Sequence, residues 1–364
     1  MRFADFLLDH WLNEFDAVPC NLAASTGPPM SLADLAGLTG ADVERLLSVP
    51  LVYTPTGGHP PLRGVVAARH EAEPEDVQIL TGASEALVIL FALAAEPGAN
   101  IVLPSPGYPA MRVLAGAFGL EARHYGLDRE HGFAIDPDEV ASLMDERSRL
   151  VVVNSPHNPT GACVSDEVMG ALYARCDLTG VPLVSDEVYH PLYFEDPYPS
   201  AACFPDAIVV GSCSKVYALS GVRVGWIVDR NPERRTRYWN ARAALSISNT
   251  ATGEAIAEIA LRHADAILQR THQAAEDNLR RLDAFLAARA ERFGWVRPQG
   301  GTVAFPWLLS NRDTRPWCRS LAEDGVLLAP GDCFEMPAHF RVGFGGDPAR
   351  FADGLARISR SVAI

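Results

Sequence analysis

The sequence predicts an α/β protein with a mostly parallel central sheet in a large domain and a smaller α+β domain beside it. Between about residues 77 and 228, short β-branched runs alternate with helical patterns, which is typical of a parallel sheet covered by helices on both faces. From residue 249 the pattern changes to a long helical stretch followed by short apolar runs. The 364 residues, 48% of them hydrophobic, suffice for a large buried core.

Each element of the large domain is predicted from one such run. The predicted strands are Val77–Leu80, Ile101–Leu103, Leu150–Asn154, Pro182–Asp186, Ile208–Ser212 and Val222–Val228. The predicted helices between them include Ala83–Ala94, Ala110–Phe118 and Asp166–Arg175. Ligands of such sheets bind beyond the carboxyl ends of the strands, so the residues that follow these strands are the first candidates for a site.

We divide the chain into an N-terminal helix and loop over residues 1–48, a large domain over 49–248 and a small domain over 249–364. Apolar side chains between Phe3 and Phe15 recur at helical spacing, which predicts an amphipathic helix that packs with the small domain. The predicted elements of the small domain after its long helix are Trp295–Pro298, Val303–Leu308, a helix near Arg315–Asp324, Val326–Ala329, His339–Val342 and a last helix from Pro348.

Charge and composition exclude several classes of partner. The formal net charge is −14, and the dense basic cluster within residues 234–242 is interpreted as a solvated helix face, so nucleic acid is not expected. The longest apolar run, Leu87–Ala95, is too short to span a bilayer, and the N-terminus lacks the features of a signal peptide. The seven cysteines are scattered without the spacing of a zinc site. We therefore expect a cytoplasmic protein without a metal site or a membrane partner.

Lys215 is the only lysine among the 31 basic residues, and the other 30 are arginines. A GC-rich coding bias explains the arginines, and a lone lysine is also compatible with chance. Lysine differs from arginine in that it can lose its proton and form a Schiff base with a carbonyl group. Its sequence neighbours therefore decide whether it is functional.

Two segments suggest a phosphate site near this lysine. Ser212, Ser214 and Lys215 follow a predicted strand and lead to Arg223, so hydroxyls, an amine and a guanidinium lie close together in sequence. Ala83 and Ser84 follow another strand and open a helix, whose free N–H groups can bind an anion. Taken alone, this second segment is also explained by a turn and an N-cap.

Three further strand ends carry polar or aromatic side chains. Asp186 ends one strand and is followed by Tyr189; a carboxylate there can pair with a pyridinium nitrogen. Asn158 lies in a proline-rich segment after a second strand, and a proline-braced turn is the alternative explanation. Tyr108 follows a third strand and offers an aromatic ring for stacking.

Taken together and in their order along the chain, these segments resemble those of the class I/II aminotransferases. Members of that family are fold-type I enzymes dependent on pyridoxal 5′-phosphate (PLP). The resemblance runs from about Tyr53 to the end of the chain. No dinucleotide-binding glycine motif, P-loop, zinc-protease motif or Gly-x-Ser-x-Gly motif competes with it. The resemblance implies a PLP-dependent aminotransferase that acts on an L-α-amino acid, and possible partners are this amino acid and a keto acid.

The resemblance also implies a role for each matched residue. Lys215 forms the Schiff base and moves the proton, and Asp186 pairs with the pyridinium nitrogen. The remaining implied cofactor ligands are Asn158 and Tyr189 at the ring oxygen, Tyr108 on the ring face, and Ala83, Ser84, Ser212, Ser214 and Arg223 at the phosphate. Arg341 matches the arginine that grips the substrate α-carboxylate, with a structural salt bridge as the alternative. Tyr53 matches a tyrosine that reaches the phosphate of a neighbouring subunit, which implies a homodimer with shared active sites; a loop cap is the alternative.

The substrate loop departs from the family pattern. Most members carry a glycine-centred loop there, whereas residues 21–29 read Asn-Leu-Ala-Ala-Ser-Thr-Gly-Pro-Pro, with Ser25 and Gly27 expected to contact substrate. This loop and segments near residues 295–301 and 344–346 resemble family members that cyclise a hydroxylated arginine by loss of its β-hydroxyl. A β-eliminating or cyclising PLP enzyme is therefore the alternative, with Glu85, Asp332 or Glu335 as candidate partners of a cationic side chain. A non-enzymatic effector-binding module is a third hypothesis, which the intact Lys215 and Asp186 disfavour.

Overall fold

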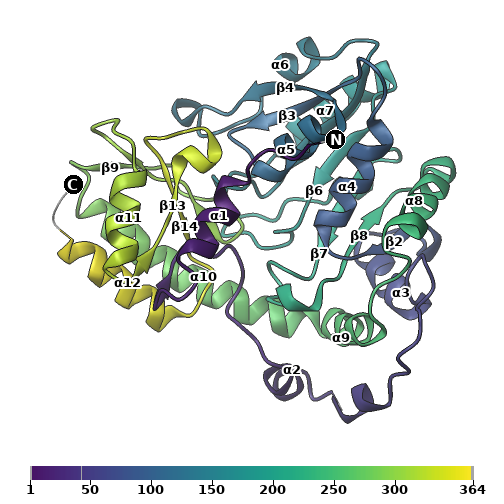
Figure 1. The fold of residues 1–364 in the computed structure, drawn as a ribbon, viewed down its shortest axis with the longest axis horizontal. Coiled ribbons are helices and arrows are strands. Elements are labelled where there is room, and N and C mark those ends of the chain that lie inside the picture. The colour runs from purple at the N-terminus through teal and green to yellow at the C-terminus, as the bar shows by residue number, and fades with distance from the viewer. Residues whose placement is uncertain (1, 42, 362–364) are drawn as a thin grey trace.

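The computed structural model describes residues 2–41 and 43–361, and its centre is a seven-stranded sheet in the order β2-β8-β7-β6-β5-β3-β4 (Figure 1). Its strands are β2 (Val77–Leu80), β3 (Asn100–Ser105), β4 (Glu121–Gly126), β5 (Ser148–Asn154), β6 (Leu183–Asp186), β7 (Ile208–Ser212) and β8 (Gly225–Val228). From β7 to β4 every neighbouring pair is parallel, whereas β8 runs antiparallel to both β7 and β2. The mostly parallel α/β fold expected from the sequence is confirmed.

Helices bury both faces of this sheet. The helices of the large unit are α3 (Pro60–Arg69), α4 (Ala83–Ala94), α5 (Pro109–Phe118), α6 (Pro137–Ser142), α7 (Asp166–Thr179) and α8 (Pro232–Leu245). Along β5, Leu150 and Val152 pack in one core cluster with α4 and α5, and Val151 and Val153 pack in the other cluster with α7. This alternation shows why the strand reads as a continuous apolar run, since neither of its faces meets water.

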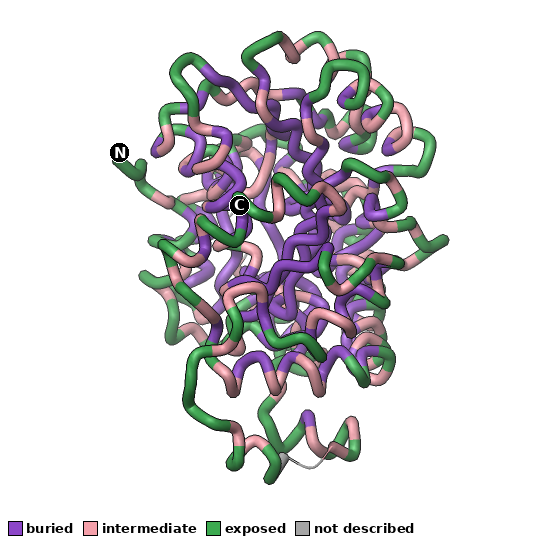
Figure 2. The backbone as a smooth tube through the Cα atoms, turned by 90° about the vertical axis from the view of Figure 1, so that its right-hand side faces the viewer, coloured by how far each residue is buried: buried purple, intermediate pink, exposed green. Residues whose placement is uncertain are grey.

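The C-terminal unit contains short strands and long helices. Its strands are β9 (Phe293–Gly294), β10 (Val303–Ala304), β11 (Trp307–Leu308), β12 (Val326–Leu327), β13 (Ala329–Pro330) and β14 (Phe340–Gly343). Its helices are α9 (Ala251–Arg262), α10 (Ala264–Ala287), α11 (Arg315–Glu323) and α12 (Pro348–Arg360). In Figure 2 the buried backbone lies mainly in the middle of the molecule and the exposed loops surround it.

The N-terminal segment contacts the C-terminal unit. It comprises α1 (Leu7–Glu14), β1 (Cys20–Asn21) and α2 (Leu32–Thr39). β1 pairs in parallel with β12, and the Trp11 indole donates a hydrogen bond of 2.8 Å to the carbonyl of Leu328. Residues near the two ends of the chain are thereby held together, more than 300 positions apart in sequence.

Several expected boundaries differ from the structure. β4 was not predicted, because this edge strand is polar and partly exposed rather than a β-branched run. Val222, expected to begin a strand, ends a 3₁₀ turn, and Arg223 adopts a left-handed conformation with φ 55° before β8 begins. The segment Trp295–Pro298 is irregular, and Val303–Leu308 is split into two short strands. Among the described residues, no helix combines the length and apolar character needed to cross a membrane.

Candidate active site

The carboxyl ends of β5, β6 and β7 converge on one cavity of about 220 Å³. The last residues of these strands are Asn154, Asp186 and Ser212, and Asn154 pairs with Asp186 in the sheet register. The Asn154 side-chain amide donates a hydrogen bond of 2.8 Å to the Asp186 carbonyl. The predicted cofactor residues that line this cavity are Ala83, Ser84, Tyr108, Asn158, Asp186, Tyr189, Ser212, Ser214, Lys215 and Arg223.

Lys215 reaches this cavity from the turn that follows β7. Its Nζ donates a hydrogen bond of 2.8 Å to the Ser25 hydroxyl and lies 5.9 Å from the centroid of the Tyr189 ring. Burial and, to a lesser extent, the nearby positive charge of Arg341 lower the pKa of Lys215 to about 8, while Asp186 opposes the shift. The lowered pKa leaves part of this amine neutral near physiological pH, which makes it suitable as a nucleophile and a base.

Asp186 is a buried carboxylate with little local compensation. Burial raises its pKa to about 6, against the lowering effects of the Val188 amide and of Lys215. Its Oδ1 accepts a long hydrogen bond of 3.3 Å from the Val188 N–H. A cation beside this carboxylate would stabilise its ionised form, and a pyridinium nitrogen has the required charge.

One end of the cavity is built for an anion. α4 begins at Ala83, directly after Gly82 with φ 78°, and no side chain caps its first N–H groups. The hydroxyls of Ser212 and Ser214 are 2.8 Å apart, and Arg223 Nη1 lies 3.4 Å from the Ser214 hydroxyl. Helix amides without a side-chain cap, hydroxyls and a guanidinium are the groups that proteins use to bind a phosphate.

Gly82 makes this anion site possible. A Cβ atom at Gly82 would lie 2.6 Å from Arg223 Nη2, so a larger residue would displace the guanidinium. Its positive φ is also a conformation that L-residues rarely adopt.

The Glu85 carboxylate accepts hydrogen bonds from the Thr81 N–H and the Ser246 hydroxyl, so it is engaged in structural contacts.

Two tyrosines enclose the middle of the cavity. Burial raises the pKa of Tyr108 to about 12, so its hydroxyl stays protonated. The Tyr189 hydroxyl is buried and has no hydrogen-bond partner among the described residues. The Ser25 hydroxyl lies near it but without the geometry of a hydrogen bond. A buried hydroxyl left without a partner is costly, and a ring oxygen of a bound cofactor would satisfy it.

Arg341 lies on β14, outside the residues that line the cavity, and contacts the lining residue Asn158. Its Nη1 donates a hydrogen bond of 3.0 Å to the Asn158 side-chain oxygen, and its Nη2 donates one of 2.7 Å to the Ala23 carbonyl. Its side chain is buried, its Nε has no hydrogen-bond partner, and it forms no ion pair with any residue that the structure describes. The salt-bridge alternative therefore lacks a partner, and the uncompensated guanidinium suits an anionic group of a ligand.

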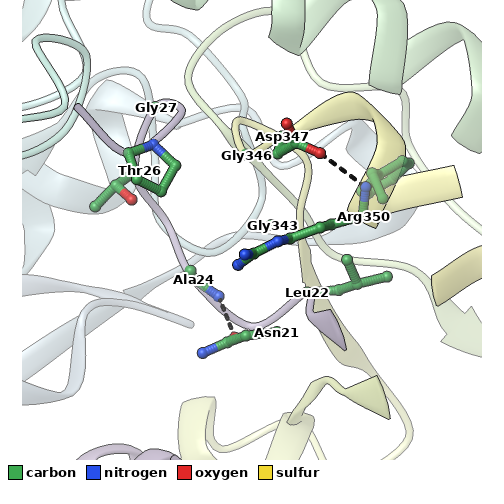
Figure 3. Close-up of a pocket in the computed structure, with 11 residues that line it drawn as sticks. Asn21, Leu22, Ala24, Thr26, Gly27, Gly343, Gly346, Asp347 and Arg350 are labelled. Atoms are coloured by element: carbon green, nitrogen blue, oxygen red, sulfur yellow. Dashed lines mark hydrogen bonds between the residues drawn. The ribbon is translucent and has the colours of Figure 1, made fainter. Parts of the chain in front are cut away.

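The segment that carries Ser25 and Gly27 also borders a second cavity (Figure 3). Ser25 contacts Lys215, whereas Ala24, Thr26 and Gly27 line the second cavity, whose volume is about 450 Å³. Gly27 also donates its backbone N–H to the Lys215 carbonyl over 2.9 Å. Arg350 extends into the second cavity between this segment and Gly343, as Figure 3 shows.

The structure does not bring every predicted residue into the cofactor cavity. Tyr53 is 78% exposed and does not line the cavity of its own chain. Of the expected acidic partners, Asp332 pairs with Arg315 and Glu335 pairs with Arg112.

Asn154 lines the cavity and was missed by the sequence reasoning. It was visible as the end of a predicted strand but was given no role.

Comparisons with known proteins agree with this geometry. Residues 49–358 match the family model described as aminotransferase class I and II. The chain is 35% identical over 313 residues to capreomycidine synthase of Streptomyces vinaceus, covering 85% of this chain and 80% of the relative.

Two solved structures share the fold over the whole chain. A PLP-dependent aminotransferase from Streptococcus suis 89-1591 superposes with a TM-score of 0.94 at 25% identity, covering 100% of this chain and 98% of that one. The PLP-dependent cyclase OrfR superposes with a TM-score of 0.89 at 28% identity, covering 100% and 99%. The buried Asp186, the unpartnered Tyr189 hydroxyl and the anion site at α4 fit PLP. The chain belongs to the class I and II aminotransferase family, and its cofactor is pyridoxal 5′-phosphate.

Proposed function

We propose that the protein moves an amino group from an L-α-amino acid to a keto acid, with Lys215 as the residue that bonds the cofactor and transfers the proton. The observation that supports this most strongly is one buried lysine in a cavity that also holds Asp186, together with a buried arginine without an ion pair among the described residues, Arg341, which contacts the lining residue Asn158. Lys215 can bond the aldehyde carbon of PLP, Asp186 can pair with its ring nitrogen, and Arg341 can bind the α-carboxylate of an amino acid.

Each residue has a defined task in this proposal. Arg341 and Asn158 bind the substrate α-carboxylate, which fixes the orientation of the bonds at Cα. Lys215, with its pKa lowered to about 8, takes the proton from Cα as a neutral amine. Bound PLP supplies an electron sink for the charge left at Cα. Asp186 stays ionised beside the ring nitrogen and thereby keeps that nitrogen protonated. Tyr189 donates a hydrogen bond from its hydroxyl to the ring oxygen.

The visible absorption spectrum of the purified, PLP-loaded protein tests this proposal. Adding a substrate amino acid should convert the band of the lysine-bound cofactor into that of the amine form, and a keto acid should restore the first band. Failure to transfer nitrogen to any keto acid, across a panel of L-amino acids, would exclude transamination.

A second candidate is β-elimination and cyclisation of a hydroxylated arginine. It is supported by the similarity to capreomycidine synthase and by the Ser25–Lys215 hydrogen bond of 2.8 Å, which lies where the substrate loop departs from the family pattern. In this reaction the spectrum would pass through a transient band with 3-hydroxyarginine and recover without a keto acid. An unchanged spectrum with 3-hydroxyarginine would exclude this candidate.

We also propose a homodimer in which Tyr53 completes the neighbouring active site. Figure 1 shows α2 and the segment after it extending away from the body of the molecule. The exposed apolar residues of this segment are Leu47, Leu51, Val52 and Tyr53, with 89%, 88%, 67% and 78% exposure. Such a run of exposed apolar side chains is typical of a protein interface.

Mixing two inactive variants tests the shared site. If Tyr53→Ala and Lys215→Ala each lack activity, a heterodimer of the two should contain one intact site and recover part of it. Light scattering should give twice the mass of 39.3 kDa. A monomer, or no recovery in a verified heterodimer, would contradict the shared site.

A further inference from the structure

A buried asparagine, Asn249, joins two of the segments that form the anion site. It lies between α8 and α9 and is 7% exposed. Its side-chain Nδ2 donates hydrogen bonds of 3.0 Å to the carbonyl of Leu80 and to the carbonyl of Arg223. Leu80 ends β2, two residues before Gly82 and the start of α4. One amide group therefore bridges the strand that leads into α4 and the arginine expected at the phosphate.

The two bridged segments meet at the end of a strand pair. Leu80 of β2 and Gly225 of β8 form the last pair of their ladder. A Cβ atom at Gly225 would lie 2.6 Å from the Ala83 backbone nitrogen, so the start of β8 lies directly against the start of α4. The Asn249 amide thus ties the two chains together where the ladder ends and no longer fixes their spacing.

Arg223 depends on its backbone for its position. The residue is exposed, and its guanidinium donates a hydrogen bond of 3.0 Å to the Ser220 carbonyl and longer ones of 3.4 and 3.5 Å to the Ser214 hydroxyl and the Thr81 carbonyl. Its backbone adopts φ 55°, a left-handed conformation that is uncommon for residues other than glycine. The hydrogen bond from Asn249 to the Arg223 carbonyl stabilises this conformation and with it the position of the guanidinium.

Arg242 of α8 fixes the orientation of the Asn249 amide. Arg242 is fully buried, and its Nη2 donates to the Asn249 Oδ1. A guanidinium has no acceptor, so the amide oxygen must face Arg242 and the NH₂ group must face the two carbonyls. The Arg242 Nη1 donates to the carbonyls of Thr56 and Ile79, and Thr56 lies in the segment that follows Tyr53. Neither Asn249 nor Arg242 lines the cofactor cavity.

A second asparagine has the same set of contacts far from the anion site. Asn278 of α10 is buried, and its Nδ2 donates hydrogen bonds of 3.0 and 2.9 Å to the carbonyls of Phe344 and Gly346. Its Oδ1 accepts one of 3.3 Å from Arg281. Asn278 belongs to the C-terminal unit and does not line the cofactor cavity. It is therefore a matched control for the loss of a buried side-chain amide such as that of Asn249.

We propose that Asn249 is a positioning residue for the cofactor phosphate, because it sets the position of the Arg223 guanidinium relative to the uncapped N–H groups of α4, so that both bind one phosphate. Asn249 acts through Arg223 and α4 and does not contact the cofactor itself. This inference rests on the proposed function, in which Lys215 bonds a cofactor whose phosphate lies at Arg223 and α4.

Comparing PLP with pyridoxal, which lacks the phosphate, tests this role. Both molecules carry the aldehyde that bonds Lys215, so the ratio of their dissociation constants measures the contribution of the phosphate. Absorbance titrations of the full-length PLP-free protein provide both constants, and the wild type should prefer PLP strongly. Asn249→Ala should lower this preference by roughly tenfold, by weakening PLP and leaving pyridoxal almost unchanged. Asn278→Ala should leave the preference at its wild-type value.

The preference separates phosphate positioning from a general loss of stability. A loosened fold would weaken PLP and pyridoxal together and leave the ratio of their dissociation constants intact. If Asn249→Ala does not fold, Asn249→Ser provides a second variant, with thermal unfolding as the check on both.

Two results would overturn the inference: an Asn249 variant with the wild-type preference for PLP, or an equal loss of preference in Asn278→Ala. Both can occur while amino acids still convert the cofactor spectrum. A wild type that does not prefer PLP to pyridoxal would contradict the phosphate site itself. The proposed function would instead fail if no amino acid converts the spectrum of the PLP-loaded wild type.

Discussion

The two walls of the active-site cavity are built in different ways. The cofactor wall comes from one stretch, from Ala83 to Arg223, and its side chains sit at the ends of neighbouring strands and at one helix N-terminus. The substrate wall consists of Ser25 and Arg341, which contact the lining residues Lys215 and Asn158 and come from opposite ends of the chain. The comparison teaches that cofactor binding is carried by local motifs, whereas substrate choice depends on long-range packing.

The largest expected effect lies on the cofactor wall. Lys215→Ala should abolish turnover, because the chain contains no other lysine to replace it. Single-turnover measurements on the PLP-loaded variant would show this. Ser214→Ala provides a matched control, since it should weaken PLP binding without removing the base. Substantial turnover by Lys215→Ala would contradict the assignment.

Arg350, outside the active site, provides a matched control for Arg341. Arg341 lies buried beside Asn158, and Arg350 lies in the second cavity shown in Figure 3. Arg341→Leu should lower kcat/KM for amino acids by about 100-fold, because a charge-assisted bond to the carboxylate is lost. Arg350→Leu should leave kcat/KM near the wild-type value. Equal effects of the two substitutions on kcat/KM would contradict the claim that Arg341, and not Arg350, binds the substrate carboxylate.

Removing PLP should make stability depend on pH through Asp186. The pKa of Asp186 is about 6 in the folded protein, and its ordinary value, which applies to the unfolded chain, is 3.8. Between these values the folded protein binds more protons than the unfolded one, so the free energy of unfolding of the apoprotein should fall as pH rises from about 4 to 6, by about 3 kcal/mol.

The cofactor should counteract this loss. A pyridinium nitrogen beside Asp186 stabilises the ionised carboxylate, so the PLP-loaded protein should lose less stability over the same range. Urea unfolding of both forms measures the difference, and Asp186→Asn should remove it. An identical pH dependence of the apo and PLP-loaded wild-type protein would argue against contact between Asp186 and the ring nitrogen.

The smallest expected effect concerns Ser25. Ser25→Ala removes one hydrogen bond to the Lys215 amine and should lower kcat by roughly tenfold. Thr26→Ala, whose side chain lies at the second cavity, should have little effect. If the two variants are equally active, Ser25 does not position the lysine.

The contrast between the walls also explains what could be predicted from the sequence. The parallel sheet and the residues of the cofactor wall were predictable, because each follows an apolar strand that is buried on both faces. The hydrogen bond between Lys215 and Ser25 was not predictable, since the two residues lie 190 positions apart in sequence. The edge strand β4 was missed for a related reason, because its polar side chains lack an apolar pattern and its place depends on pairing with β3.

The central claim is that Lys215 bonds the cofactor, and borohydride reduction of the PLP-loaded protein tests it most directly. Reduction makes the lysine–cofactor bond permanent, and peptide mass mapping then locates the attached group. We expect the mass of pyridoxyl phosphate on the peptide that contains Lys215 and on no other peptide. An attached group at the N-terminal amine instead, or none at Lys215 in protein saturated with PLP, would contradict the account.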